Sequence, residues 1–503
     1  MRRLARCAPL APRWRHVWFL LTLGATFLHP ASAPVVLLDL GWTLRSGDWM
    51  VHQRQLLTID PFTSAPAVAN QVNVQWLAQL VTYGLYTLGG LPLVITANAL
   101  VVTLAYGLVL AASVSASGHP RLACLAVAAG YAVGITNLTP RPQTLAYVLF
   151  ALFLLVLLRA GKGGPGRSLW LLPPAMAVWA NVHGSFFLGW LLLGCAACGA
   201  AIEGRSLRPA RPFVLTLLGC LGAACLTPYG PGSLSYLVTI VGNPIIRGLA
   251  LEWGPTSVSR PEGLLFFASV IALAVVVVRA PTRLRPTEAL LLLVFGCLGL
   301  TAVRSVVWWG MAAAPVAARL LATLRRPAVE PTRERPALNL AVMGLASGLV
   351  VASLPWAKQA NPLVPAAHRE VVVQEVPQDL VHFLQAHTYE GRMLTRVGWG
   401  GYFDWTLWPA HRPFLDGRFE LHPPEVWLDY LAMMFPRADW EALTDRYGVG
   451  YMVLSKQDEA GLIDAARATP IWRVDYEDNH AVVFVRSVAS QQLVVHSQGS
   501  TED

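Results

Sequence analysis

The feature that most constrains this chain is a series of apolar runs, most of them close to the length of a bilayer-spanning helix. About 20 predominantly apolar residues cross the hydrocarbon core as one α-helix. The pattern predicts about eleven spans, near residues 17–38, 92–116, 121–138, 143–159, 169–182, 184–202, 211–228, 263–279, 287–302, 305–323 and 337–356. The chain is 55% hydrophobic and only 13% charged, which is far more apolar than a soluble domain. The sequence therefore predicts a polytopic α-helical protein of the lipid bilayer.

The basic residues are dispersed among short loops, which excludes a nucleic-acid-binding patch as the reason for the net charge of +9. With the amino end inside, predicted inner loops hold twenty Lys and Arg, and predicted outer loops hold six. This asymmetry predicts a multi-pass protein of the inner (plasma) membrane with a cytoplasmic amino end. An odd number of spans then places the residues after 356 outside the cytoplasm.

The chain divides by composition near residue 357, since twenty of its twenty-nine acidic residues follow that point. We expect a transmembrane domain over residues 1–356 with an outer loop at 39–78, an extracytoplasmic soluble α/β domain over 357–490, and a disordered tail at 491–503. Helices are predicted over 376–387, 438–449 and 459–468, and strands over 391–397, 451–456 and 481–488.

Two glycine-containing segments of the soluble part resemble functional loops. The run from Gly398 to Tyr402 lacks the spacing of a phosphate-binding loop, so it is predicted to form a tight turn. The segment with Asp416 and Arg418 has two interpretations, a lid that reaches into a site or a structural salt bridge.

Unusual polar residues near the span ends all fall on the predicted outer face. They are Asp39, Trp42, Arg45, Arg141, Asn181, His183, Tyr229, Glu252, Trp253 and Arg304. Their convergence predicts a site at the outer membrane–water boundary, built between helices and covered by loops. The alternative is that Trp, Tyr and Arg anchor helix ends at the interface, as in many membrane proteins. That alternative is weaker for Asp39 and His183, because neither residue type is a usual anchor.

Asp39 is the predicted catalytic base, because it lies where the first apolar run meets water. Asp60 is the second candidate, although Asp60-Pro61 beside Phe, Thr and Ser also fits ordinary turn chemistry. Arg304 and Arg141 occupy turns between apolar spans, where a guanidinium can grip a phosphate.

The predicted substrate-binding set contains four further residues. His183 could donate a hydrogen bond to phosphate or sugar, but a histidine beside a glycine is equally often a packing residue. Trp42 could stack on a sugar ring or mark the interface. Arg45 and Glu252 complete the set.

Together these pieces resemble the GT-C superfamily of polytopic glycosyltransferases, and the likeness extends over nearly the whole chain. The matching motifs are Asp39-Leu40-Gly41-Trp42, Asp60-Pro61-Phe62-Thr63, Gln75-Trp76-Leu77, Arg141-Pro142-Gln143, Asn181-Val182-His183-Gly184, Pro228-Tyr229-Gly230, Glu252-Trp253, Gly398–Tyr402 and Asp416-Gly417-Arg418. The resemblance implies transfer of a sugar from a polyprenyl-phosphate-linked donor to a cell-envelope acceptor, which could be a glycan, a lipid or a protein. It places the catalytic acid of the first outer loop at Asp39. Not all members need a metal, so a divalent metal is left open.

Two other classes of function remain as alternatives. Many GT-C enzymes carry two adjacent acids in the first outer loop, but Leu40 follows Asp39 here, which keeps an inactive anchoring or assembly protein in view. A lipid or solute transporter would place polar residues through the bilayer midplane and would often show a repeated half. The polar residues here gather at one face instead, and no internal repeat is evident.

Overall fold

The computed structural model describes residues 12–69, 71–164, 166–249, 251–325, 334–362, 364–365, 369–373, 376–437 and 439–487, so the predicted disordered tail at 491–503 lies outside them. Two compact units are present. Unit 1 comprises Met1–Val35, Leu85–Val238 and Arg247–Val371, and unit 2 comprises Val36–Gly84, Thr239–Ile246 and Val372–Asp503. The first predicted outer loop thus groups with the C-terminal residues.

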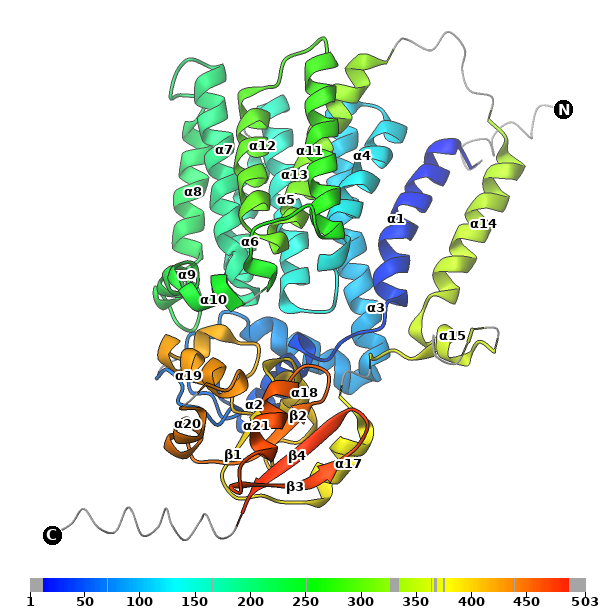
Figure 1. Cartoon of the computed structure of the whole chain (residues 1–503). Coiled ribbons are helices and arrows are strands. Elements are labelled where there is room, and N and C mark those ends of the chain that lie inside the picture. Colours follow the sequence, from blue (N-terminus) through cyan, green and yellow to red (C-terminus); the bar gives the residue numbers. More distant parts are fainter. Residues whose placement is uncertain are drawn as a thin grey trace. The chain divides into compact units, whose positions relative to one another are not determined.

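Unit 1 is built from helices (Figure 1). They are α1 (Trp14–Ser32), α4 (Pro120–Val133), η3 (Ile135–Asn137), α5 (Pro142–Gly163), η4 (Arg167–Leu171), α6 (Leu172–Val182), η5 (Gly184–Phe186), α7 (Phe187–Glu203), α8 (Arg211–Ala223), η6 (Leu251–Trp253), α11 (Pro261–Arg279), α12 (Pro286–Thr301), η7 (Val303–Ser305), α13 (Val306–Leu324), α14 (Pro336–Ala352) and α15 (Pro355–Ala360). Three more helices cross the boundaries between the units: α3 (Trp76–Ser117), α9 (Gly232–Gly242) and α10 (Pro244–Leu249).

A helix occupies each of the eleven predicted spans. Within the described residues, five helical segments are long and apolar enough to cross a membrane, and four other apolar helices are shorter. The long helix α3 is two helices joined at a kink, because Gly89 and Gly90 leave the helical conformation and Gly90 has a φ of 63°.

Helix α13 lies at the centre of unit 1, and its close approach to α4 depends on two glycines. A Cβ at Gly130 would lie 2.3 Å from the carbonyl oxygen of Gly310, and a Cβ at Gly310 would lie 2.2 Å from that of Gly130. The buried rings of Tyr147 and Phe150 in α5 pack on Trp308 of α13, each at a centroid distance of 5.0 Å. Aromatic packing and small residues therefore bring these helices together.

Unit 2 contains α2 (Asp39–Gln53) and a four-stranded sheet with helices. The strands are β1 (Arg392–Thr395), β2 (Val449–Ser455), β3 (Trp472–Glu477) and β4 (Ala481–Arg486), and the helices are α17 (Gln378–Ala386), α18 (Val397–Thr406), η8 (Phe419–Leu421), α19 (Pro424–Met434), α20 (Trp440–Arg446) and α21 (Ala460–Arg467). The strand order is β1-β2-β4-β3; β1 is parallel to β2, and β4 is antiparallel to both of its neighbours. The predicted mixture of strands and helices is confirmed.

Two local expectations differ from the structure. The segment Gly398–Tyr402, predicted as a tight turn, lies inside helix α18. Gly400 and Gly401 serve close packing rather than a bend, because a Cβ would lie 2.7 Å from the carbonyl oxygen of Leu415 at Gly400 and 2.1 Å from that of Leu38 at Gly401. Strand β3, at the edge of the sheet, has no counterpart among the predicted elements, although its residues Trp472–Glu477 alternate apolar and polar side chains as a strand does.

Close glycine packing and backbone hydrogen bonds both join the first-loop segment to the C-terminal residues of unit 2. Helices α2 and α18 pack through Gly41 and Gly401, where a Cβ at Gly41 would lie 2.0 Å from the carbonyl oxygen of Gly401. Backbone N–H groups of Ser64 and Ala65 donate to the carbonyls of Pro413 and Phe414 at 2.9 and 3.1 Å.

Candidate functional site

Three charged residues predicted for the site converge in unit 1. Arg141 precedes α5, Glu252 lies in η6, and Arg304 lies in η7. Arg141 Nη1 donates to Glu252 Oε2 at 2.9 Å, and Arg304 Nη1 lies 3.3 Å from Glu252 Oε1. Three turns that are far apart in the sequence therefore build one Arg–Glu–Arg cluster. Its formal net charge is +1, so it is able to attract an anion.

Neighbouring groups fix the orientation of the two arginines. Arg304 Nη2 donates to the buried amide oxygen of Gln143 at 2.7 Å, and its guanidinium lies 4.6 Å from the ring centroid of Trp253. Arg141 Nε donates to Thr139 Oγ1 at 3.1 Å. Both side chains stay partly accessible, with exposed fractions of 17% for Arg141 and 18% for Arg304. The guanidinium planes are thus held in place while solvent or a ligand is still able to reach them.

Burial opposes ionisation of Glu252, yet the charges of Arg304 and Arg141 hold the pKa of its carboxyl below the ordinary value. Glu252 is therefore a carboxylate at neutral pH. Its carboxylate oxygens pair with the two guanidinium groups as phosphate oxygens would.

His183, at the turn between α6 and η5, is a neutral imidazole. Burial, and then the charges of Arg304 and Arg141, lower the pKa of His183 to about 3. Its Nδ1 accepts the backbone N–H of Ser185 at 3.0 Å and lies 2.9 Å from Ser185 Oγ, which itself accepts from Trp179 Nε1 at 3.1 Å. With Nδ1 acting as an acceptor, the ring proton is on Nε2, so His183 presents a hydrogen-bond donor.

Asp39 lies in unit 2, in the first turn of α2, and is half-buried. A Cβ at Gly417 would lie 3.8 Å from Asp39 Oδ1, so this carboxylate is next to the Asp416-Gly417-Arg418 segment. The predicted base and the predicted lid segment therefore belong to one neighbourhood within unit 2.

Arg45, nearly two turns after Asp39 in α2, is used for packing. Its Nε and Nη2 donate to the carbonyls of Asp404 and Trp405 at 2.9 and 2.7 Å, at the end of α18, and its Nη1 donates to Asp48 at 2.6 Å. A cation at a helix C-terminus stabilises the last carbonyl groups. Through these contacts Arg45 holds α2 against the end of α18. Substrate binding by Arg45 stays a prediction.

Asp60 is part of a buried ionic cluster. One oxygen accepts the backbone N–H of Thr63 at 2.9 Å and its hydroxyl, and the other lies 3.0 Å from Arg418. Arg418 also binds Asp416 through both Nε and Nη2, and its guanidinium lies 5.8 Å from the ring of the buried Trp42. The Asp416–Arg418 pair is thus a salt bridge, as in the second of the two interpretations of this segment.

Asp404 completes this cluster and had no counterpart in the sequence prediction. Its side chain is fully buried, and Arg418 Nη2 lies 4.0 Å away. Burial, and then the charge of Asp416, raise the pKa of Asp404 well above its ordinary value, while the Arg418 charge, acting against burial, lowers the pKa of Asp416. The signal in the sequence was an acid within the otherwise apolar and aromatic segment Gly401–Leu407. Gln143, the partner of Arg304, belongs to the Arg141-Pro142-Gln143 motif, but the sequence indicated no role for its side chain.

No group of three His, Cys, Asp or Glu residues able to hold a metal ion occurs among the described residues. Three of the acids above instead share Arg418 as their cation.

Together, the apolar helical unit and the sheet-containing unit define a multi-pass membrane protein with the GT-C glycosyltransferase fold. ArnT from Cupriavidus metallidurans, solved bound to undecaprenyl phosphate, is similar with a TM-score of 0.53 and 14% identity over 94% of this chain and 98% of that chain.

Two other solved structures share the fold. The oligosaccharyltransferase of Archaeoglobus fulgidus in its apo form has a TM-score of 0.51 at 12% identity, over 94% of this chain and 74% of that chain. The arabinofuranosyltransferase AftD from Mycobacteria has a TM-score of 0.53 at 17% identity, over 93% of this chain but 41% of that chain. No protein-family model and no curated protein sequence matches the chain.

Proposed function

We propose that this protein is a membrane glycosyltransferase that moves a sugar from a polyprenyl-phosphate donor to an acceptor hydroxyl in the cell envelope. The observation that carries the proposal is the convergence of Arg141 and Arg304 on Glu252 at the ends of apolar helices. Two oriented guanidinium groups are suited to a phosphodiester that becomes a leaving phosphate during transfer. The fold is shared with ArnT, which has been solved with undecaprenyl phosphate bound.

In this proposal, Arg304 and Arg141 bind the phosphate oxygens and stabilise the charge that grows on them as the sugar–phosphate bond breaks. His183 donates its Nε2 proton to a phosphate or sugar oxygen. Because its pKa lies far below neutrality, it acts as a donor of fixed protonation and not as a titrating acid.

Asp39 is the proposed base. It takes the proton of the acceptor hydroxyl while that oxygen attacks the anomeric carbon, so the proton leaves the hydroxyl as the new glycosidic bond forms. Substitution of a general base costs about 10²- to 10⁴-fold in rate. Asp60 remains a candidate, but its contacts with Thr63 and Arg418 engage both carboxylate oxygens.

The first experiment measures transfer from a panel of radiolabelled polyprenyl-phosphate sugars by protein in membranes, with and without EDTA. Asp39→Asn should lower kcat by at least about 100-fold without a matching rise in donor KM. The matched control is Asp379→Asn, because Asp379 is an exposed aspartate in the first turn of α17. It should retain activity.

A second pair of variants tests the phosphate site. Arg304→Gln should raise the donor KM as well as lower kcat, whereas Arg260→Gln, an exposed arginine before α11, should change neither. Full activity in Asp39→Asn would reject Asp39 as the base. No transfer from any donor by the wild-type protein would favour an anchoring role, and uptake or release of a lipid or solute without transfer would favour a transporter.

A further inference from the structure

A second candidate site lies at the other end of unit 1 from the arginine cluster. A pocket of about 310 Å³ is lined by residues at the end of α5, the end of α7 and the start of α12. Arg141 and Arg304 instead flank the start of α5 and the end of α12. With a rise of 1.5 Å per residue, the 22 residues of α5 separate the two places by about 33 Å. A donor phosphate at the arginine cluster therefore does not reach this pocket.

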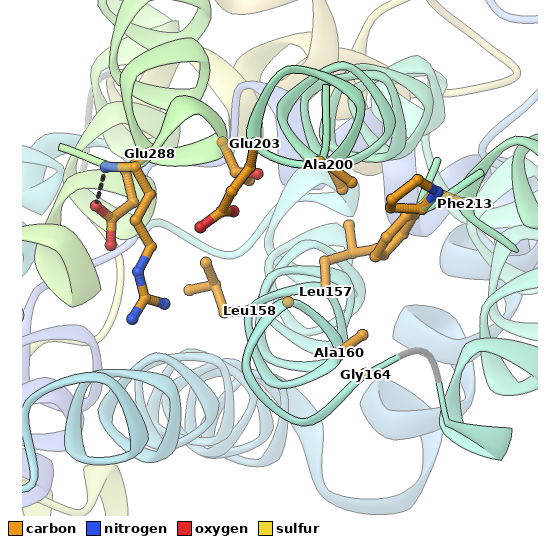
Figure 2. Close-up of a pocket in the computed structure, with 14 residues that line it drawn as sticks. Leu157, Leu158, Ala160, Gly164, Ala200, Glu203, Phe213 and Glu288 are labelled. Atoms are coloured by element: carbon orange, nitrogen blue, oxygen red, sulfur yellow. Dashed lines mark hydrogen bonds between the residues drawn. The ribbon is translucent and has the colours of Figure 1, made fainter. Parts of the chain in front are cut away.

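The walls and the rim of the pocket differ in chemistry. Leu157 and Phe213 are buried and form part of an apolar wall, and Figure 2 shows the Glu203 side chain between Glu288 and these apolar residues. Arg285 contributes a guanidinium to the same lining. The pocket thus combines apolar surface with two carboxylates, Glu203 and Glu288, and the guanidinium of Arg285, all at the ends of apolar helices.

The charges of the lining are balanced. Glu288 is neutralised by Arg319, whose Nε donates to it at 2.6 Å, and it also accepts the backbone N–H of Arg285 at 2.9 Å. Glu203 and the Arg285 side chain take part in no ion pair with another described residue. One negative and one positive charge therefore remain for a ligand, so the occupant that the pocket fits is a zwitterion with an apolar part.

We propose that this pocket binds the headgroup region of a zwitterionic phospholipid with a primary ammonium group, such as phosphatidylethanolamine. The ammonium donates to Glu203, the phosphate accepts from Arg285, and the adjoining hydrocarbon packs on Leu157 and Phe213. A volume of about 310 Å³ is at the low end of roughly 300–1,000 Å³ for small-molecule sites, so it suits a headgroup and the first carbons of a chain. An anionic lipid without an ammonium group has no donor of this kind for Glu203.

Native mass spectrometry of the purified full-length protein tests this assignment. The probes are phosphatidylethanolamine, phosphatidylcholine and phosphatidylglycerol with identical acyl chains. Phosphatidylethanolamine should be retained most strongly, because choline has no N–H to donate and glycerol has no positive charge. Glu203→Gln and Arg285→Gln should each weaken its retention about tenfold, as expected for loss of a charge-assisted hydrogen bond.

Two further variants separate local chemistry from misfolding. Ala200→Phe fills the pocket without changing a charge and should abolish specific retention, whereas Arg279→Gln, at the exposed end of α11, should leave it unchanged. Melting temperatures verify that each variant is folded. Equal retention in every variant would show lipid bound only at the general protein surface and would overturn the proposal. Preferential phosphatidylglycerol binding that is lost only in Arg285→Gln would also overturn it.

Discussion

Replacing Gly41 with alanine tests how tightly α2 and α18 determine the geometry around Asp39. A Cβ at Gly41 would lie 2.0 Å from the carbonyl oxygen of Gly401, and real Cβ atoms essentially never come closer than 3.0 Å to such a neighbour. The two helices must therefore separate by about 1.0 Å. Because Asp39 is two residues before Gly41 in the same turn, this movement displaces its carboxylate.

The size of the effect follows from two opposing contributions. Alanine is favoured over glycine inside a helix by about 0.5–1 kcal/mol. Overpacking against a backbone carbonyl costs about 1–3 kcal/mol or more, because the obstructing atom belongs to a helix and not to a flexible side chain. We expect a net local destabilisation of about 1–2 kcal/mol, which corresponds to roughly 5- to 30-fold faster amide exchange in α2 and α18 through local opening.

Hydrogen–deuterium exchange with peptide-level detection measures this directly in the purified protein. Gly461→Ala is the matched control, since Gly461 lies inside α21 of the same unit and a Cβ there meets nothing within 4 Å. That variant should exchange more slowly in α21. Gly401→Ala should behave like Gly41→Ala, because its Cβ would lie 2.1 Å from the carbonyl oxygen of Leu38.

The double variant with both Gly41→Ala and Gly401→Ala is the stricter part of the test. A single separation of α2 from α18 relieves both contacts, so the second substitution should cost less than the first. Fully additive effects, or unchanged exchange in Gly41→Ala, would refute the packing argument. If Asp39 is the base, a displacement of about 1 Å should also lower kcat by about 10²-fold in protein that is still folded.

The remaining predictions concern the charged clusters. Glu252→Gln raises the net charge of the arginine cluster from +1 to +2, so the donor KM should fall about fivefold in transfer assays, less so at high salt. Asp416→Asn leaves buried Arg418 without its two-pronged partner and should cost about 3–5 kcal/mol, measured by thermal melting. The pKa of Asp404 is higher in the folded protein than in the unfolded chain. Its contribution to folding stability is therefore fully present at a pH below the unfolded pKa and is lost as the pH rises through the folded pKa. Asp404→Asn should remove this loss of stability at high pH. Asp60→Asn should lower the melting temperature while turnover per folded molecule is kept.

Much of unit 1 was predictable because a bilayer-spanning helix is encoded locally. Each predicted span contains a helix, since about 20 apolar residues leave a chain in a bilayer few other structures. The convergence of Arg141, Glu252 and Arg304 also followed from local information. Charged side chains at span ends avoid the hydrocarbon core, so those on one face gather at the same membrane–water boundary. Gln143 was passed over because an amide beside a proline carries no charge signal of its own.

Unit 2 was less predictable, because its contacts join residues far apart in the sequence. Asp60 meets Arg418, and Gly41 meets Gly401, across more than 350 residues. Periodicity within a window of residues contains no information about such pairs. The prediction of a turn at Gly398–Tyr402 is wrong for the same reason, since the close neighbour of Gly401 is Leu38, which is far away in the sequence.

This packing also changes what the resemblance motifs mean. The segments around Gly41, Asp60, Gly401 and Arg418 contact one another within unit 2, and their contacts are hydrogen bonds, ion pairs and close glycine approaches. A motif that is required for packing and a motif that is required for chemistry look alike in a sequence. Asp39 differs from Asp60 and Asp404 because it is half-buried, whereas the other two side chains are almost fully enclosed. A base must reach an acceptor hydroxyl, so accessibility together with the adjacent Gly417 favours Asp39 over the buried acids.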